Sequence, residues 1–324
     1  MMDKPRYFNK IEILDDYRIR KSSADIHKIE AEYAWYESNE IFCTPQIYEA
    51  LHGNNYAAYD IEYIHMKTLA RYFLEGGLSE KGFENILYVL QRYCTKGSSV
   101  ACTDYTKMLI HSMYKDKTYD RLAQANINLD ESYIINRVPS PTIREIIEDC
   151  PVYLKDKDIR HIHGDLCFSN ILINPHIEDL YLTPNTPTEN IPFSSVIVID
   201  PRGYLPDGTI TDIGDVNYDV AKLAHSIIGR YDQIKHGSGF YLSKLDEREY
   251  SLYISTTDLQ KDIEEAFIKI FSDFDYYNIM IHLFFSMIPL HADRPDHQEQ
   301  MLINAIRLYL EREARKKRQL SLCI

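Results

Sequence analysis

The stretch that decides the fold runs from His161 to Ile173 and reads His161-Ile162-His163-Gly164-Asp165-Leu166-Cys167-Phe168-Ser169-Asn170-Ile171-Leu172-Ile173. It places a histidine, an aspartate and an asparagine directly before an apolar run that predicts a β-strand. A second apolar run, Val196-Ile197-Val198-Ile199, ends on Asp200. If the two runs pair as strands, Asn170 and Asp200 come to the same end of the pair.

Carboxylate and amide side chains at strand ends are the groups that phosphoryl transfer requires. The reaction needs an acceptor hydroxyl held in line, metal ions on the phosphates and a site that tolerates the charge. Asp165 is placed to orient the hydroxyl and take its proton. Asn170 offers a neutral oxygen and Asp200 a carboxylate to Mg²⁺, which prefers oxygen ligands. The spacing therefore predicts a site for a magnesium-bound nucleoside triphosphate.

The same spacing has a purely structural alternative, in which His163 is a core histidine and Asp165 a turn residue. Three features favour the functional interpretation. A strand follows the motif at once, Asp200 ends the next strand, and a further polar block comes after it. That block reads Gly214-Asp215-Val216-Asn217-Tyr218-Asp219-Val220-Ala221.

On these blocks the chain resembles the aminoglycoside phosphotransferase and choline kinase-like family of small-molecule kinases. The family pattern is H-G-D-x-x-x-x-N, then I-D, then G-D-x-x-Y-D-x-A, and residues 160–230 contain all three in order. The resemblance implies that Asp165 is the catalytic base, with His163 beside it in the catalytic motif. It implies that Asn170 and Asp200 are metal ligands and that Asp219 is a buried aspartate that braces the catalytic loop.

The N-terminal part offers the remaining groups of a nucleotide site. Residues 8–21 predict a hairpin with a turn at Asp15-Asp16, and Lys21 at a strand end is the candidate phosphate lysine. A helix is expected over residues 26–37, where Glu32 is the candidate partner of Lys21 and Glu30 the reserve. The alternative is that Lys21 is one of 36 basic residues on a solvated strand.

Residues 56–64 are rich in strand formers and predict a strand that leads into a hinge. By resemblance, backbone groups around Glu62 and Ile64 bind the adenine or guanine ring, which leaves ATP and GTP equally open as donors. Kinases usually cover the phosphates with a glycine-rich loop, but the first glycine of this chain is Gly53. We therefore expect either an abbreviated N-terminal lobe or another turn, near Asn9-Lys10, that covers the phosphates.

The acceptor site has weaker candidates. Asp200 is followed by Pro201-Arg202-Gly203, which departs from the D-F-G sequence of protein kinases and favours a small-molecule kinase. Arg202 is a candidate to contact a phosphate or to pair with an acid, and an ion pair is its expected contact. His291 and Asp293 lie at a predicted helix junction, for which a capped turn is the plainer interpretation. The stretch 133–151 precedes the catalytic loop and predicts a connecting loop with a short helix over residues 142–149.

Composition limits the functional classes. The charged residues number 36 basic and 49 acidic, a net charge of 36 − 49 = −13, which argues against general nucleic-acid binding. No apolar run approaches the roughly 20 residues of a membrane span, and the N-terminus has no apolar signal segment. The six cysteines form no C-x-x-C pair, which is typical of reduced thiols in the cytoplasm.

Together these features predict an α+β, two-lobed protein-kinase-like fold, with a small antiparallel-sheet lobe over residues 1–66 and a larger, mostly helical lobe over 67–324. The expected activity is ATP- or GTP- and Mg²⁺-dependent phosphorylation of a small-molecule hydroxyl: an aminoglycoside, a sugar or polyol, or an amino alcohol. The alternative is a pseudokinase that binds nucleotide or a partner without turnover. The sequence leaves the oligomeric state open.

Overall fold

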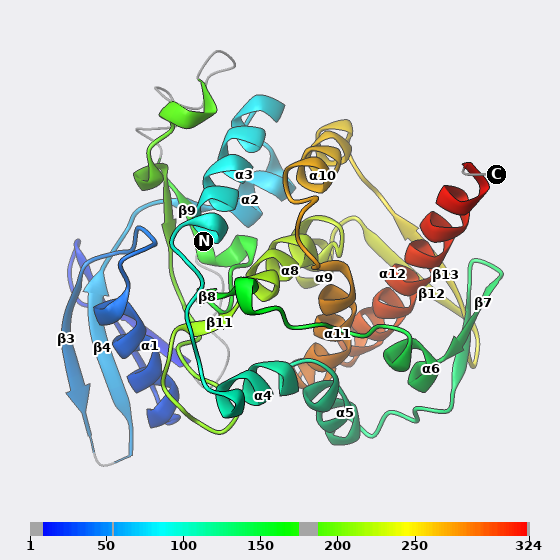
Figure 1. Cartoon of the computed structure of the whole chain (residues 1–324), viewed down its shortest axis with the longest axis horizontal. Helices are drawn as coiled ribbons and strands as arrows, with labels where there is room; N and C mark the ends of the chain where they lie inside the picture. The colour runs from blue at the N-terminus through cyan, green and yellow to red at the C-terminus, as the bar shows by residue number, and fades with distance from the viewer. Residues whose placement is uncertain (1–8, 54, 175–186, 323–324) are drawn as a thin grey trace. The chain divides into compact units, whose positions relative to one another are not determined.

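The computed structural model describes residues 9–53, 55–174 and 187–322. Figure 1 shows the helices and strands of the chain. Backbone contacts divide the chain into two compact units. The first unit consists of Met1–Cys102, Lys155–Asp219 and Ala266–Phe271. The second consists of Thr103–Leu154, Val220–Glu265 and Ser272–Ile324. Phe8, at the start of the expected hairpin, and most of the polar stretch between the two apolar runs lie outside the described residues.

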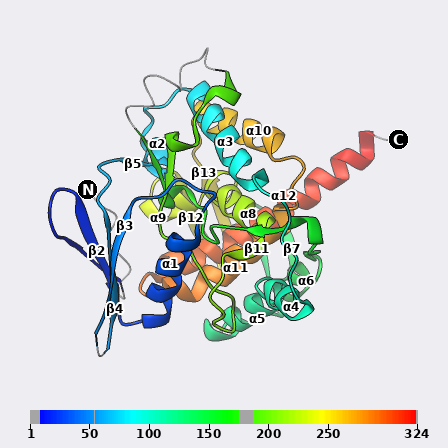
Figure 2. The same cartoon turned by 60° about the vertical axis from the view of Figure 1, so that its left-hand side comes forward.

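The first unit begins with an antiparallel sheet in the order β1-β2-β4-β3. Its strands are β1 (Asn9–Ile13), β2 (Arg18–Ser23), β3 (Ile47–His52) and β4 (Ala57–Glu62). Helix α1 (Ile26–Ser38) follows β2, starts at the N-cap Asp25 and contacts the sheet (Figure 2). The β1–β2 register places Lys21 on β2 opposite Ile11, and β2–β4 pairing places it opposite Tyr59. The predicted hairpin, helix and strand are confirmed here.

The rest of the first unit combines helices with two small sheets. The helices are α2 (Leu69–Glu75) and α3 (Glu80–Thr95), and the sheets are ordered β10-β9-β5 and β11-β8. The strands are β5 (Lys67–Thr68), β8 (Ile159–His161), β9 (Ile171–Ile173), β10 (Val196–Val198) and β11 (Ile213–Asp215). The two apolar runs of the sequence, now β9 and β10, pair antiparallel as predicted.

Apolar side chains at helical spacing build the core of this unit. On α3, Phe83, Ile86, Leu87 and Leu90 are fully buried, which confirms the predicted face. β9 is buried at all three positions, so the strand after the catalytic motif is anchored in the core. The loop that precedes it is thereby fixed at one end.

The second unit is mostly helical with one four-stranded sheet, ordered β12-β13-β6-β7. Its strands are β6 (Ser132–Ile135), β7 (Val138–Thr142), β12 (Phe240–Asp246) and β13 (Glu249–Ile254). Its helices are α4 (Asp104–Ser112), α5 (Lys115–Gln124), α6 (Ile143–Glu148), α9 (Tyr231–His236), α11 (Tyr277–Met287) and α12 (Pro295–Leu322). The boundary between the units falls inside α8 (Val216–Ile227) and α10 (Asp258–Ile270).

One sequence expectation needs correction in the second unit, and one hairpin there was not expected. The stretch 133–151 is not a connecting loop, because β6 and β7 form a hairpin before α6. The short helix itself is confirmed: Thr142 and Glu145 form a reciprocal capping box at its start. The β12–β13 hairpin had no counterpart among the predicted elements.

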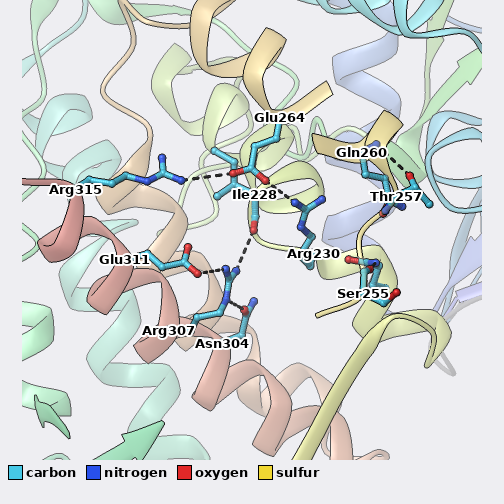
Figure 3. A network of polar contacts seen from close by, with 11 residues as sticks. Ile228, Arg230, Ser255, Thr257, Gln260, Glu264, Asn304, Arg307, Glu311 and Arg315 are labelled. Atoms are coloured by element: carbon cyan, nitrogen blue, oxygen red, sulfur yellow. Dashed lines mark hydrogen bonds and ion pairs between the residues drawn. The ribbon is translucent and has the colours of Figure 1, made fainter. Parts of the chain in front are cut away.

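A network of charged side chains holds α12 to its neighbours within the second unit (Figure 3). Glu264 on α10 accepts from Arg230 and from Arg315 of α12. Arg307 bonds Glu311, Asn304 and the carbonyl oxygen of Ile228. Two basic residues of α12, Arg307 and Arg315, therefore make contacts within the chain. Arg315 is the first residue of the basic run over 315–318.

The α+β class is confirmed: a small antiparallel sheet lies at the N-terminus, and helices dominate the later part of the described chain. None of the helices in residues 9–53, 55–174 and 187–322 is both long enough and apolar enough to cross a membrane.

Candidate functional site

A chain of ion pairs starts from the N-terminal sheet. Lys21 is almost fully buried on β2, and its Nζ lies 2.7 Å from Oε2 of Glu32 and 2.8 Å from Oδ1 of Asp200. Glu32 projects from α1 and is 2% exposed, whereas the side chain of Asp200 is 45% exposed. Glu30, the reserve candidate, lies 3.6 Å from Nδ1 of His52 instead. The strand lysine, helix glutamate and strand-end aspartate are therefore one cluster.

Charge balance fixes the protonation of this cluster. Burial alone would lower the pKa of Lys21, but the carboxylates of Asp200 and Glu32 outweigh it and raise that pKa well above its ordinary value. For Asp200, loss of solvent would raise the pKa, and the Lys21 charge lowers it below the ordinary value. At neutral pH the lysine is thus a cation and Asp200 a carboxylate.

The segment from His163 to Asn170 forms a tightly held loop. The carboxylate of Asp219, which is 1% exposed, accepts from the backbone N–H groups of His163 and Gly164 at 2.7 and 2.8 Å. Gly164 has φ +76°, and a Cβ there would lie 2.7 Å from Cβ of Arg202, so glycine is required on both counts. The loop is pressed against the segment that follows Asp200.

Asp165 and Asn170 lie side by side in this loop. The amide nitrogen of Asn170 donates to the carbonyl oxygen and to Oδ2 of Asp165, at 2.9 and 3.2 Å. The backbone N–H of Ile199 donates to the carbonyl oxygen of Asn170 at 3.0 Å, which continues the β9–β10 ladder. Asp200 therefore follows directly beside Asn170. Burial and, to a smaller extent, the charge of Asp165 would raise the pKa of Asp200, but Lys21 holds it below its ordinary value.

The donor set fits Mg²⁺ as a partner of phosphate. With its nitrogen turned toward Asp165, Asn170 has Oδ1 for a cation, and Asp200 adds a half-exposed carboxylate. Within the described residues, no group of three or more His, Cys, Asp or Glu side chains is placed to hold a metal by itself. Mg²⁺ is commonly held by one or two protein oxygens together with phosphates and water, which is what this pair can provide.

His163 lies behind the loop. It is fully buried, its ring packs edge-on against Trp35 with centroids 5.3 Å apart, and its Nδ1 accepts from the backbone N–H of Asp165. Burial lowers the pKa of His163 to about 4, so the ring is neutral at physiological pH. Its hydrogen bond to the loop is the one from the backbone N–H of Asp165.

The other candidates are more dispersed. Glu62 ends β4, where its carboxylate accepts from the backbone N–H of Gln46, and Ile64 lies just beyond this strand. Arg202 does not form the expected ion pair within the described chain: its guanidinium donates to the carbonyl oxygen of Tyr204 and lies over that ring, 5.0 Å from the centroid. Its expected ion pair is replaced by a cation–π contact.

His291 and Asp293 belong to the second unit, whereas the cluster above belongs to the first. His291 ends a short 3₁₀ helix and its carbonyl oxygen accepts from the backbone N–H of Arg294, just before α12 begins. Asp293 is exposed in this turn. The turn at a helix junction agrees with the plainer of the two sequence interpretations.

Two site residues escaped the sequence analysis. Tyr36 on α1 accepts at its hydroxyl from the backbone N–H of Asp200, at 3.1 Å. Tyr59 on β4 donates its hydroxyl to Glu32 at 2.8 Å. In the sequence both residues look like core aromatics of the predicted helix and strand. The available signals were the spacing of Tyr36, four residues after Glu32, and the pairing of Tyr59 with Lys21.

No family model matches the chain, and no curated protein matches it. Solved structures do. An aminoglycoside 2'-phosphotransferase IIIa mutant in complex with GDP matches with 11% identity and a TM-score of 0.47, over 97% of this chain and 91% of the other. A gentamicin complex of an APH(2") type IIa enzyme matches with 11% identity and a TM-score of 0.44, over 93% and 87%.

An aminoglycoside 3'-phosphotransferase of type VIII matches with 10% identity and a TM-score of 0.42, over 91% of this chain and 94% of the other. At such identities and TM-scores, the function has to be argued from the site of this chain itself.

Proposed function

We propose that this protein is a phosphotransferase that moves the γ-phosphate of a nucleoside triphosphate, ATP or GTP, to a hydroxyl of a small molecule. One observation carries the proposal: Lys21 bridges Glu32 and Asp200, while Asn170 joins Asp165 to the same end of the β9–β10 pair. A lysine for the phosphates, a carboxylate and an amide for the metal, and a second carboxylate for the hydroxyl are thereby assembled in one unit.

Each residue has a role that follows from its contacts. Lys21, held by Glu32, is the cation for the phosphates. Asn170 and Asp200 would hold Mg²⁺, which when bound neutralises phosphate charge. Asp219 and His163 act on the loop backbone and are positioning residues, since both are buried and bond backbone groups. Glu62 and Ile64 remain the proposed hinge beside the nucleotide base.

The transfer step uses Asp165 as the base. The acceptor hydroxyl donates its hydrogen bond to the Asp165 carboxylate, and its oxygen forms a bond to the γ-phosphorus. The bond between that phosphorus and the β–γ bridging oxygen breaks, the nucleoside diphosphate leaves, and Asp165 carries the hydroxyl proton. Asn170 fixes the carboxylate that performs this transfer by donating to its Oδ2.

The acceptor remains open among aminoglycosides, sugars or polyols, and amino alcohols. A nucleotide-consumption screen of the purified protein with Mg²⁺ over these three classes tests the proposal. We expect one class to stimulate release of diphosphate, and Asp165→Asn to abolish that stimulation while the thermal midpoint stays within a few degrees. Full turnover by Asp165→Asn would contradict the assignment of the base.

A pseudokinase is the second candidate, because Gly53 is the first glycine in the chain and follows the first three strands, so no glycine-rich loop precedes Lys21. In that case, nucleotide would raise the thermal midpoint, but no acceptor class would be phosphorylated. Asp165→Asn would then leave nucleotide binding unchanged.

A further inference from the structure

Asp200 is held from two directions by polar contacts. Its carboxylate accepts from Lys21, as described above, and its backbone N–H donates to the hydroxyl of Tyr36. The ring of Tyr36 packs edge-on against that of Tyr59, with centroids 5.9 Å apart, and the Tyr59 hydroxyl donates to Oε2 of Glu32. The same Oε2 atom accepts from Lys21.

The direction of each of these hydrogen bonds follows from its members. The hydroxyl of Tyr59 donates its proton to the carboxylate of Glu32, which can only accept. The hydroxyl oxygen of Tyr36 accepts from the backbone N–H of Asp200, which can only donate. Tyr36 therefore acts on the backbone of Asp200, and Tyr59 acts on the carboxylate that holds Lys21.

The backbone of Asp200 needs such a fixed partner. Its φ is +58°, in the left-handed region that residues with a Cβ seldom adopt. Tyr36 stands four residues after Glu32, so both side chains leave the same face of α1. Tyr59 is opposite Lys21 in the β2–β4 register. The helix and the sheet thus each contribute one hydroxyl to the geometry of Asp200.

We infer that Tyr36 and Tyr59 are positioning residues that set the Asp200 carboxylate for metal-bound nucleotide. The Tyr36 hydroxyl fixes the backbone of Asp200, and the Tyr59 hydroxyl fixes Glu32 and through it Lys21, so that carboxylate and lysine are aligned together. The inference rests on the proposed function, because Asp200 is taken as the metal ligand. Neither tyrosine touches substrate in this assignment; each acts through another residue.

The variants Tyr36→Phe and Tyr59→Phe remove one hydroxyl each and keep the ring. We expect Tyr36→Phe to lower kcat about tenfold and to raise severalfold the Mg²⁺ concentration for half-maximal rate, with the KM for the acceptor unchanged. Tyr59→Phe should change the same quantities less, because Glu32 keeps its bond to Lys21. Since both hydroxyls act on partners of Lys21, the two effects should be coupled, and the double variant should be less impaired than the product of the single effects.

Tyr93→Phe is the matched control. Tyr93 is also buried in the first unit, but its hydroxyl bonds the backbone of Cys43, Phe193 and Val196 and none of Lys21, Glu32 and Asp200. Removal of this hydroxyl should lower the thermal midpoint while leaving the Mg²⁺ dependence and kcat at wild-type values. An equal shift of the Mg²⁺ dependence in Tyr93→Phe would show general loosening and overturn the inference.

A second measurement separates this inference from the proposed function. Binding of Mn²⁺ with ADP, followed by electron paramagnetic resonance, requires no turnover. Weaker Mn²⁺ binding in Tyr36→Phe but not in Tyr93→Phe supports the positioning role even if no acceptor is phosphorylated. Unchanged Mn²⁺ affinity and kcat in Tyr36→Phe overturns it while the activity of the wild type stands. Absence of Mn²⁺–nucleotide binding in the wild type overturns both.

Discussion

At the scale of single residues, Asp219 joins two backbone groups of the catalytic loop. Its carboxylate accepts from the N–H groups of His163 and Gly164, and all three residues are buried. Asp219→Ala leaves both donors without this acceptor, at about 1–3 kcal/mol for each buried group. We expect the free energy of unfolding to fall by roughly 2–5 kcal/mol, measured by urea denaturation.

Asp219→Asn is the informative companion to that change. It keeps one acceptor oxygen for the two N–H groups, so its loss should be smaller than that of Asp219→Ala. If both variants unfolded at the wild-type urea concentration, the bracing role of Asp219 would have to be abandoned.

Sequence spacing could predict the site residues that lie close together in the chain and those that belong to a recognisable motif. Asp165 and Asn170 lie five positions apart, and Asp200 ends a strand whose apolar run is plain. Tyr36 and Tyr59 could not be found in this way. The bond from Asp200 to Tyr36 joins residues 164 positions apart, and a buried tyrosine has the same pattern as any core aromatic. Arg202 shows the converse, since an arginine among acids suggested an ion pair where Tyr204 supplies the contact.

At the scale of elements, Gly203 determines how the segment after Asp200 packs on α1. Its φ is +71°, and a Cβ there would lie 2.2 Å from the carbonyl oxygen of Ala31. Gly203→Ala must therefore move the segment or the helix that carries Glu32. We expect a loss of stability of about 2–4 kcal/mol, with a fall in nucleotide turnover, measured by denaturation and by rate assays.

Gly97→Ala is the control for backbone strain alone. Gly97 has φ +82° and no atom within 4 Å of an added Cβ, so only the cost of a positive φ applies. That cost is about 1 kcal/mol, and turnover should be unaffected. Equal losses in the two variants would mean that contact with α1 contributes nothing.

Elements with a clear hydrophobic periodicity could be predicted from the sequence. Strands that contain turn-forming residues could not. The apolar face of α3 and the continuous runs of β9 and β10 are unambiguous patterns. β7 contains Pro139 and Pro141, which normally argue against a strand. They are tolerated because β7 is an edge strand of its sheet. The polar, tyrosine-containing β12 and β13 likewise have no clean alternation of apolar and polar residues.

At the scale of the whole molecule, buried neutral histidines make stability depend on pH. His282 on α11 is 3% exposed, and its Nε2 is bonded to the carbonyl oxygen of Cys150 at 2.8 Å. Burial lowers the pKa of His282 to about 4; the bond to Cys150 opposes this, and the charges of Lys115 and Arg312 add to it. The unfolded chain takes up a proton near pH 6.5, whereas the folded chain does so only near pH 4.

Stability is therefore full above pH 6.5 and is lost as the pH falls from 6.5 toward 4, because the unfolded state binds more protons there. For each histidine, such a pKa shift lowers the free energy of unfolding by roughly 2 kcal/mol at pH 5. His163, whose pKa burial also lowers to about 4, adds a second contribution of the same sign.

His282→Gln keeps a donor for Cys150 but does not titrate, so it should remove about half of the loss of stability between pH 7.5 and pH 5. Urea midpoints at the two pH values measure this, and a wild-type loss undiminished in His282→Gln would place the acid sensitivity elsewhere in the chain.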